Sequence, residues 1–236
     1  MAAAPRRGIL RWLPWVVMAM AAAVVVPQLW FAAHIWWWRD HPVGDTTFMA
    51  WRMDELRARN PKAQRRYTWV AYDRISGNLK RAMVAAEDAK FIDHEGFDWD
   101  GIALALEKNQ KKGRVVAGGS TITQQLAKNL FLSPSRSYLR KAEEAVITVM
   151  LEAMLPKRRI LEIYLNVIEW GSGVFGAEEA SRHYFGATAA QLSAEQAARL
   201  AAMAPNPRFY ERNPGAPGLN RKIDVILARM PGAEIP

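Results

Sequence analysis

Apolar and polar positions follow a helical period in several segments of this 236-residue chain, and one segment departs from that pattern. Residues 12–38 contain no Asp, Glu, Lys or Arg. At about 1.5 Å per residue, such a helix is long enough to cross a hydrocarbon core of roughly 30 Å. We therefore expect residues 12–38 to form a transmembrane helix.

The charges on the two sides of this apolar run differ. Arg6, Arg7 and Arg11 precede it without any acid, whereas four bases and four acids balance in residues 39–59, which follow it. This asymmetry predicts that residues 1–11 are cytoplasmic. A cleaved signal peptide is the alternative, but its apolar region usually spans only about 7 to 15 residues. We therefore expect an uncleaved anchor, with the rest of the chain beyond the membrane.

The chain after the anchor divides into two parts. Residues 39–66 mix Trp, Arg and Asp around Asn60-Pro61 without a clear period, and we interpret them as a connector. Residues 67–236 contain the helical periods and almost no alternating strand pattern. The prediction is one mainly α-helical domain over residues 67–236.

The first candidate acid is placed by its local pattern. Leu79, Met83 and Ala86 recur at helical spacing after a turn-forming Ser-Gly-Asn sequence, so Glu87 should lie near a helix C-terminus. The helix dipole disfavours a negative charge there and should raise the proton affinity of Glu87. That position suits a general base that works near neutral pH.

A second polar block begins with a glycine-bearing, basic stretch, Gly113–Gly119. Thr121 and Gln124 then form a T-x-x-Q capping box ahead of a helix that should run through Leu130. The N-terminus of that helix would point backbone N–H groups toward an anion. No G-x-x-x-x-G-K-[ST] pattern is present, so this is not a nucleotide-binding P-loop.

The third block carries a second acid beside two cations. Arg140 and Lys141 precede Glu144 by four and three residues, which places all three side chains on one helical face. A solvent-exposed salt bridge is the simplest interpretation of that spacing. An anion-binding cluster is the alternative.

Composition narrows the possible partners. The net charge is +9, and the part of the chain beyond the anchor is itself basic. No zinc-finger or RNP-like motif appears, so we expect no nucleic-acid partner and favour anionic lipid headgroups or pyrophosphates. The chain has no cysteine, which excludes disulfides and thiolate metal sites.

Four blocks in order, EDAKFIDHEG, GGSTITQQLAKN, RKAEE and KRRILEIYLN, resemble the signature of the peptidoglycan glycosyltransferases, glycosyltransferase family 51. The similarity continues through WGSGVFGAEEASRHYFG and PNPRFY, and is greatest to the monofunctional biosynthetic peptidoglycan transglycosylases. The resemblance implies a lysozyme-like, mainly helical glycosyltransferase domain. The S-x-x-K and K-T-G motifs of a penicillin-binding domain are absent, so only polymerisation is implied.

The activity implied by this resemblance is polymerisation of lipid II in cell-wall biosynthesis. Glu87 matches the family's general base, and Glu144 matches its second acid, which could orient cations, hold a divalent ion such as Mg²⁺ or Mn²⁺, or position substrate. The positions that match the family's substrate-binding residues are Ser120, Gln124, Gln125, Lys128, Asn129, Arg136, Arg140 and Lys141.

The family also implies location and partners. We expect a single-pass protein of the cell inner membrane with a periplasmic catalytic domain. Its expected partners are lipid II, the growing glycan strand, the lipid bilayer, and proteins of wall synthesis or cell division. Within the first block, Asp88 could brace the turn at Glu87, and His94 is expected to give hydrogen-bonding support rather than to bind zinc.

Two other functions compete with this one. A muramidase-like glycoside hydrolase would also use two carboxylates, but it has little use for a cluster of cations beside them. A non-catalytic membrane-tethered scaffold predicts that a residue of the catalytic blocks is lost, and none is missing.

Overall fold

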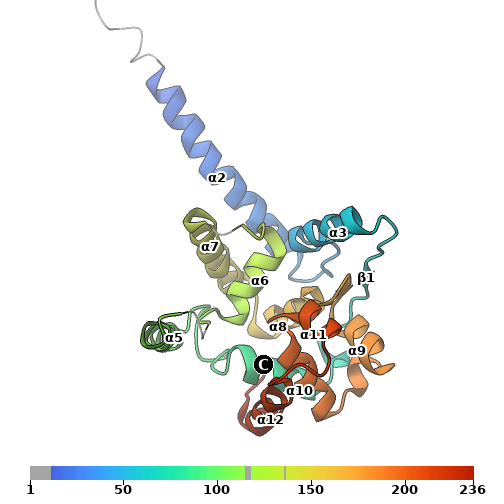
Figure 1. Cartoon of the computed structure of the whole chain (residues 1–236). Coiled ribbons are helices and arrows are strands. Elements are labelled where there is room, and N and C mark those ends of the chain that lie inside the picture. The colour runs from blue at the N-terminus through green and yellow to red at the C-terminus, as the bar shows by residue number, and fades with distance from the viewer. Residues whose placement is uncertain (1–11, 115–117, 136) are drawn as a thin grey trace, which may run out of the picture.

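The computed structural model describes residues 12–114, 118–135 and 137–236. A long helix, α2 (Leu13–Trp37), projects from a helical body (Figure 1). This helix is long and apolar enough to cross a membrane, with a mean hydropathy of 2.0. Its last turns enter the core, where the rings of Phe31 and Phe131 lie 4.9 Å apart. The apolar run is thus one helix, anchored to the body at its C-terminal end.

The segment after the anchor is not simply the connector that we expected over residues 39–66. It contains helix α3 (Thr47–Arg59), which begins at a Thr46 side chain that accepts a hydrogen bond from the Met49 nitrogen. Met49 and Met53 lie four residues apart and are both buried in the core. Arg52 between these methionines and Asp54 after them obscured the apolar face in the sequence, but tertiary packing against α6 stabilises the helix.

The body is mainly helical, as predicted. Its α-helices are α4 (Gly77–Glu87), α5 (Trp99–Lys112), α6 (Ile122–Phe131), α7 (Tyr138–Met154), α8 (Lys157–Val167), α9 (Ala177–Phe185), α10 (Ala194–Met203), α11 (Pro207–Arg212) and α12 (Leu219–Arg229). Short 3₁₀ helices are η1 (Tyr72–Arg74), η2 (Ala189–Gln191) and η3 (Met230–Gly232). The expected helix starts are present, since Ser76 caps α4 and Thr121 with Gln124 forms the capping box of α6.

A small sheet closes one side of the body. Strand β1 (Arg66–Tyr67) pairs in parallel with β3 (Val174–Phe175), and β2 (Glu169–Gly171) pairs with β3 in the antiparallel direction. The register between β2 and β3 is irregular between Glu169 and Gly171. The sheet holds Glu169 in the interior, where its carboxylate meets α3.

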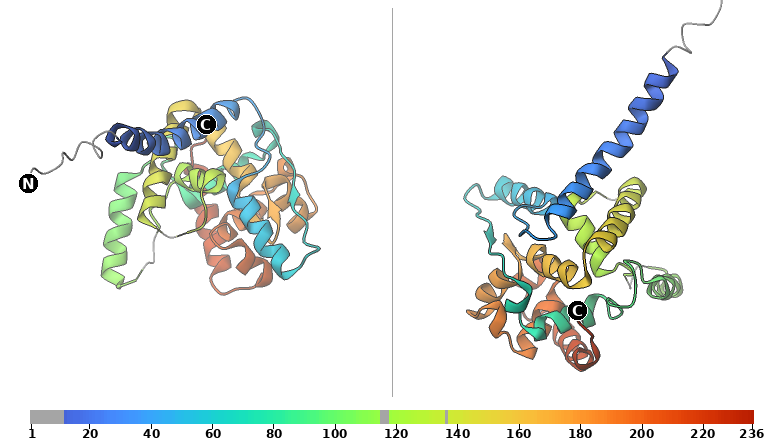
Figure 2. Two further views of the ribbon diagram at one scale, coloured as in Figure 1. Left: turned by 90° about the horizontal axis from the view of Figure 1, so that it is seen from above. Right: turned by 180° about the vertical axis from the view of Figure 1, so that it is seen from behind.

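Helix α6 lies at the centre of the body and positions the site. It packs against α3, α7 and α8, and Leu126, Ala127 and Leu130 are buried in these contacts. Helix α4 packs instead against α10 and α12, on the side of the body farthest from α2 (Figures 1 and 2). The C-terminus of α4 therefore meets the N-terminus of α6 at the boundary between two groups of helices. One group is α3, α6, α7 and α8, and the other is α4, α10 and α12.

Candidate active site

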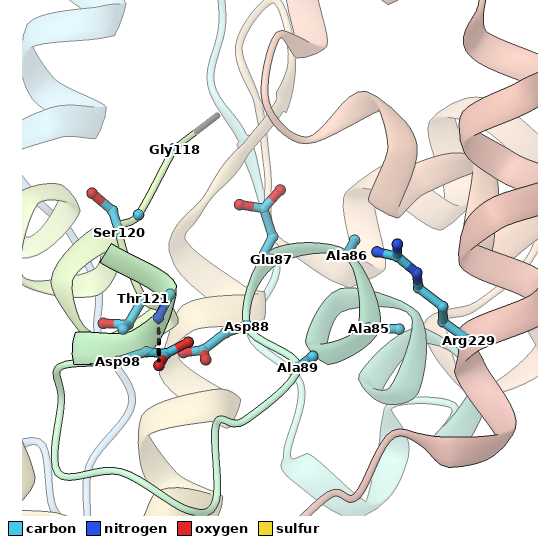
Figure 3. A pocket seen from close by; sticks show the side chains of 12 residues that line it. Ala85, Ala86, Glu87, Asp88, Ala89, Asp98, Gly118, Ser120, Thr121 and Arg229 are labelled. Carbon is cyan, nitrogen blue, oxygen red and sulfur yellow. Dashed lines mark hydrogen bonds between the residues drawn. The ribbon is translucent and has the colours of Figure 1, made fainter. Parts of the chain in front are cut away.

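Glu87 is the last residue of α4, as the sequence predicted. Its side chain points away from the end of the helix, between Ser120 on one side and Arg229 on the other (Figure 3). Burial raises the pKa of the Glu87 carboxyl above its usual value, while the hydrogen bond from Gln125 and the charge of Lys128 act in the opposite direction. The direction agrees with the expectation from the helix dipole, but burial is its largest cause.

Asp88 fastens the turn that carries Glu87. One carboxylate oxygen of Asp88 accepts a hydrogen bond from the Ile122 nitrogen at 3.0 Å, and the other lies 2.9 Å from Nε2 of His94. The Gly96 nitrogen donates to Nδ1 of His94, so the ring proton belongs on Nε2, where it is donated to Asp88. Both residues have the supporting roles proposed from the sequence.

Gln125 joins the second and first blocks directly. Its Nε2 donates to Oε2 of Glu87 at 2.6 Å, and its Oε1 accepts from the Tyr164 hydroxyl at 2.9 Å. Residues 87 and 88 thus contact positions 125 and 122 of α6, which lie three residues apart and share one helical face. The candidate base is held on α6 by two neighbouring hydrogen bonds.

Lys128 lies one turn further along α6 and is partly buried. Burial lowers the pKa of the Lys128 ammonium group, and the negative charge of Glu144 acts against that effect. Arg140 and Lys141 add repulsion, whereas Glu87 contributes attraction. The charge on Lys128 therefore interacts with the candidate base Glu87 and with the charged residues of α7.

Glu144 is not the exposed salt-bridge residue of the simplest interpretation. Its side chain is only 5% exposed, its Oε2 accepts from Arg140 Nη1 at 2.7 Å, and its Oε1 pairs with Lys141 Nζ. Both oxygens therefore hold cations. Within the described residues no group of three His, Cys, Asp or Glu side chains could hold a metal ion. In this arrangement Glu144 contacts Arg140 and Lys141 directly.

The remaining predicted binding residues have different surroundings. Ser120 is exposed beside Glu87. Gln124 is 4% exposed, and its Oε1 accepts from the Thr121 nitrogen, so the side chain oxygen serves the helix cap. Asn129 is buried and donates to the Gln125 carbonyl at 2.7 Å. Arg136 lies outside the described residues. Ser120 is thus free to meet a ligand, whereas Gln124 and Asn129 support α6.

Two cavities adjoin Glu87. One of about 160 Å³ lies between Glu87, Ser120 and Asp98 (Figure 3). The other, of about 350 Å³, lies on the side of α12 and is lined by Lys222 and the apolar Val225. Arg229 borders both cavities. Glu87 can therefore face a group bound on either side.

A larger cavity of about 640 Å³ lies between the anchor and the cationic cluster. Val24, Pro27 and Phe31 of α2 line one side, and Leu139 and Arg140 line the other. Nε of Arg140 is buried and has no hydrogen-bond partner among the residues that the structure describes. This cavity connects apolar surface of the anchor with one of the cations that are paired with Glu144.

Several residues at the site were not selected from the sequence. Tyr164 belongs to the fourth block and has the spacing of a buried helix residue. That spacing does not reveal that its hydroxyl contacts Gln125. Lys222 and Arg229 lie on a helix without a distinctive motif. Arg52 and Glu169 line a further cavity of about 220 Å³ beside Gln125. Only the folding of distant segments brings these residues to the site.

Comparison with known proteins identifies the family of this chain. The family model described as Transglycosylase matches residues 54–231. The chain is 61% identical over 226 residues to the biosynthetic peptidoglycan transglycosylase of Dechloromonas aromatica (strain RCB). The aligned residues cover 96% of this chain and 98% of the relative. It is 59% identical over 221 residues to the protein of that name from Chromobacterium violaceum, covering 94% and 97% of the two chains. The chain therefore belongs to the transglycosylase family and is a peptidoglycan transglycosylase of cell-wall biosynthesis.

Proposed function

We propose that this enzyme polymerises lipid II. The 4-hydroxyl oxygen of an acceptor GlcNAc attacks the anomeric carbon of a MurNAc that is linked to undecaprenyl pyrophosphate. The new C–O bond is a β-1,4 linkage formed with inversion, and the bond from the anomeric carbon to the pyrophosphate breaks. The hydroxyl proton passes to a base, and undecaprenyl pyrophosphate leaves with the bonding electron pair.

Glu87 is the base in this proposal. An alcohol is a competent nucleophile only when its proton is removed as the bond forms, and a carboxylate within hydrogen-bonding reach can accept that proton. The raised pKa of Glu87 strengthens it as a proton acceptor, and the hydrogen bond from Gln125 favours its ionised form. Because Glu87 borders cavities on two sides, the acceptor and donor sugars can bind on opposite sides of its carboxylate.

The leaving pyrophosphate needs positive charge rather than an acid. It departs as a stable anion, so cations that meet its oxygens stabilise the transition state. The observation that carries the proposal is the position of Lys128. It lies one turn from Gln125, the hydrogen-bond donor to Glu87, on the helix that packs against α7 with its cluster of Arg140, Lys141 and Glu144. In this proposal the base acts on the acceptor hydroxyl and the cations act on the leaving pyrophosphate of the same reacting pair. Both oxygens of Glu144 hold cations, so it is not placed to donate a proton as a hydrolase acid would.

The anchor suits a lipid-linked donor. The cavity of about 640 Å³ joins apolar residues of α2 to Arg140, so a polyprenyl chain can enter from the bilayer while its pyrophosphate meets the cations. In this proposal the protein spans the inner membrane once, its N-terminus is cytoplasmic and its catalytic domain is periplasmic. The arginines before the apolar run support that orientation.

The test is incubation of the full chain in detergent micelles with purified lipid II, with and without Mg²⁺ or a chelator. We expect glycan chains and released undecaprenyl pyrophosphate from the wild type. Glu87→Gln should remain folded and lose at least about 10²-fold in rate. Glu107→Gln, at an exposed position that pairs with Lys111, is the matched control. Shortening of preformed glycan strands would instead indicate a hydrolase, and activity retained in Glu87→Gln would remove Glu87 from the role of base.

A further inference from the structure

Both ends of the Gln125 amide are engaged. Its nitrogen donates to Oε2 of Glu87 at 2.6 Å, and its oxygen accepts from the Tyr164 hydroxyl at 2.9 Å. An amide can turn over and exchange its nitrogen and oxygen, and the reversed orientation would place an oxygen against the carboxylate. The direction in which Tyr164 donates therefore decides which end of Gln125 faces Glu87.

Tyr164 is well suited to fix that direction. It lies on α8, is 1% exposed and is among the largest fully buried side chains of the protein. Burial raises the pKa of its phenol well above the usual value, and the charge of Glu87 acts in the same direction. The phenol therefore keeps its proton throughout the working pH range and donates it to the Gln125 oxygen.

Several other titratable or charged groups surround Glu87. They come from the end of α4, the start of α5, α6, α8 and α12, and are Asp88, Asp98, Lys128, Tyr164, Arg221, Lys222 and Arg229. Within the described part of the chain, however, the hydrogen bond to the Glu87 carboxylate comes from the neutral Gln125 amide. The cations attract the carboxylate from a distance, whereas Gln125 occupies one of its two oxygens.

We propose that Tyr164 is a positioning residue of the transfer reaction, which holds the Gln125 amide with its nitrogen toward Oε2 of Glu87 and leaves Oε1 to take the acceptor proton. The inference rests on the proposed role of Glu87 as base. Tyr164 touches Gln125, not the substrate, and acts through the geometry of the carboxylate. Its hydroxyl links α8 to α6, 39 residues earlier in the chain, so the base is held by two helices.

Tyr164→Phe removes the hydroxyl and keeps the buried ring. Gln125 is then free to turn over, so the Glu87 carboxylate loses its donor for part of the time and becomes easier to protonate. We expect kcat with lipid II to fall about tenfold with KM changed less than twofold, because a small misplacement of a base affects the chemical step. The acidic limb of the pH–rate profile should move to higher pH.

Two further variants separate positioning from packing. Gln125→Leu should produce the same shift, and the double variant should be no slower than Gln125→Leu alone, because both substitutions break one chain of contacts. Tyr184→Phe is the matched control, since the Tyr184 hydroxyl donates to the Trp170 carbonyl at 2.7 Å and does not touch the site. It should lower the thermal midpoint slightly and leave kcat and the acidic limb unchanged.

The proposal is overturned if Tyr164→Phe keeps the wild-type kcat and acidic limb, or if its effect multiplies with that of Gln125→Leu. A substrate-free measurement separates this outcome from failure of the proposed function. The Glu87 carboxyl can be titrated by ¹³C NMR in micelles, with its signal assigned by comparison with Glu87→Gln. We expect its pKa to be higher in Tyr164→Phe than in the wild type. If the wild type makes no glycan, the proposed function fails. If the pKa of Glu87 is the same in Tyr164→Phe and in the wild type, the positioning role fails, whatever the glycan assay shows.

Discussion

Nε of Arg52 lies 2.8 Å from Oε2 of Glu169, and this ion pair joins the helix after the anchor to the strand behind the site. Both side chains are largely buried. Arg52 also pairs with Glu55, and Nε of Arg208 lies 3.8 Å from the second oxygen of Glu169. Two arginines and two glutamates thus connect α3, α11 and β2 in one cluster.

Removal of Arg52 should destabilise the protein strongly. Arg52→Met leaves the buried carboxylate of Glu169 without its nearest partner, and the expected loss is about 3–5 kcal/mol in the free energy of unfolding. Arg59→Met is the matched control, because Arg59 also pairs with Glu55 but is 73% exposed, and its loss should stay below about 1 kcal/mol. Guanidinium denaturation followed by circular dichroism measures both. Equal losses of unfolding free energy in the two variants would show that the buried Arg52–Glu169 pair stabilises the protein no more than the exposed Arg59–Glu55 pair does.

Glu169 should make the stability depend on pH. Burial raises the pKa of its carboxyl from 4.5 to about 7, so the folded protein binds this proton more tightly than the unfolded chain does. The resulting stabilisation is fully present below pH 4.5 and is lost as the pH rises through 7. In Glu169→Gln this contribution should vanish, so the difference in unfolding free energy between wild type and variant should change by roughly 3 kcal/mol between pH 4.5 and 7. Parallel stability curves would contradict the prediction.

Lys128 should set part of the alkaline limit of activity. Burial lowers the pKa of its ammonium group, so this lysine loses its charge at lower pH than an exposed lysine does. A rate that needs the cation falls in that range. Lys128→Arg keeps the positive charge, so it should move the alkaline limb of the pH–rate profile to higher pH. Lys128→Met removes the charge, so it should lower the rate about 10²-fold and weaken the dependence of the rate on salt. The exposed Lys108→Arg is the control and should leave the limb in place.

Gly176 should tolerate no side chain. Its φ is +82°, and a Cβ would lie 2.6 Å from the Asn166 carbonyl oxygen, so Gly176→Ala adds a backbone clash to conformational strain. Gly186 has a φ of +64° with open space around it, and Gly186→Ala should cost only about 1 kcal/mol. We expect a loss above roughly 3 kcal/mol for Gly176→Ala in the same denaturation experiment. A smaller loss than that of Gly186→Ala would mean that the β3–α9 turn adjusts.

Some predictions depended only on neighbours along the chain, and the structure agrees with them. The capping box of Thr121 and Gln124 begins α6, and Glu87 ends α4. The pairing of Arg140 with Glu144 follows from a separation of four residues on one helix. Helix α3 was missed because its apolar face is narrow, with Met49 and Met53 among charged residues, so it depends on packing against α6 more than on its own pattern.

The sequence by itself thus determined the long apolar helix, the mainly helical class, the helix ends, the ion pairs within one helix and, through four ordered motifs, the family. Each of these depends on residues a few positions apart or on a linear pattern. Only the tertiary structure decided that Gln125 meets Glu87 across 38 residues and that Arg52 meets Glu169 across 117. Helical periodicity shows which face of a helix is buried but not which helix covers it, because that choice depends on how all the side chains pack together.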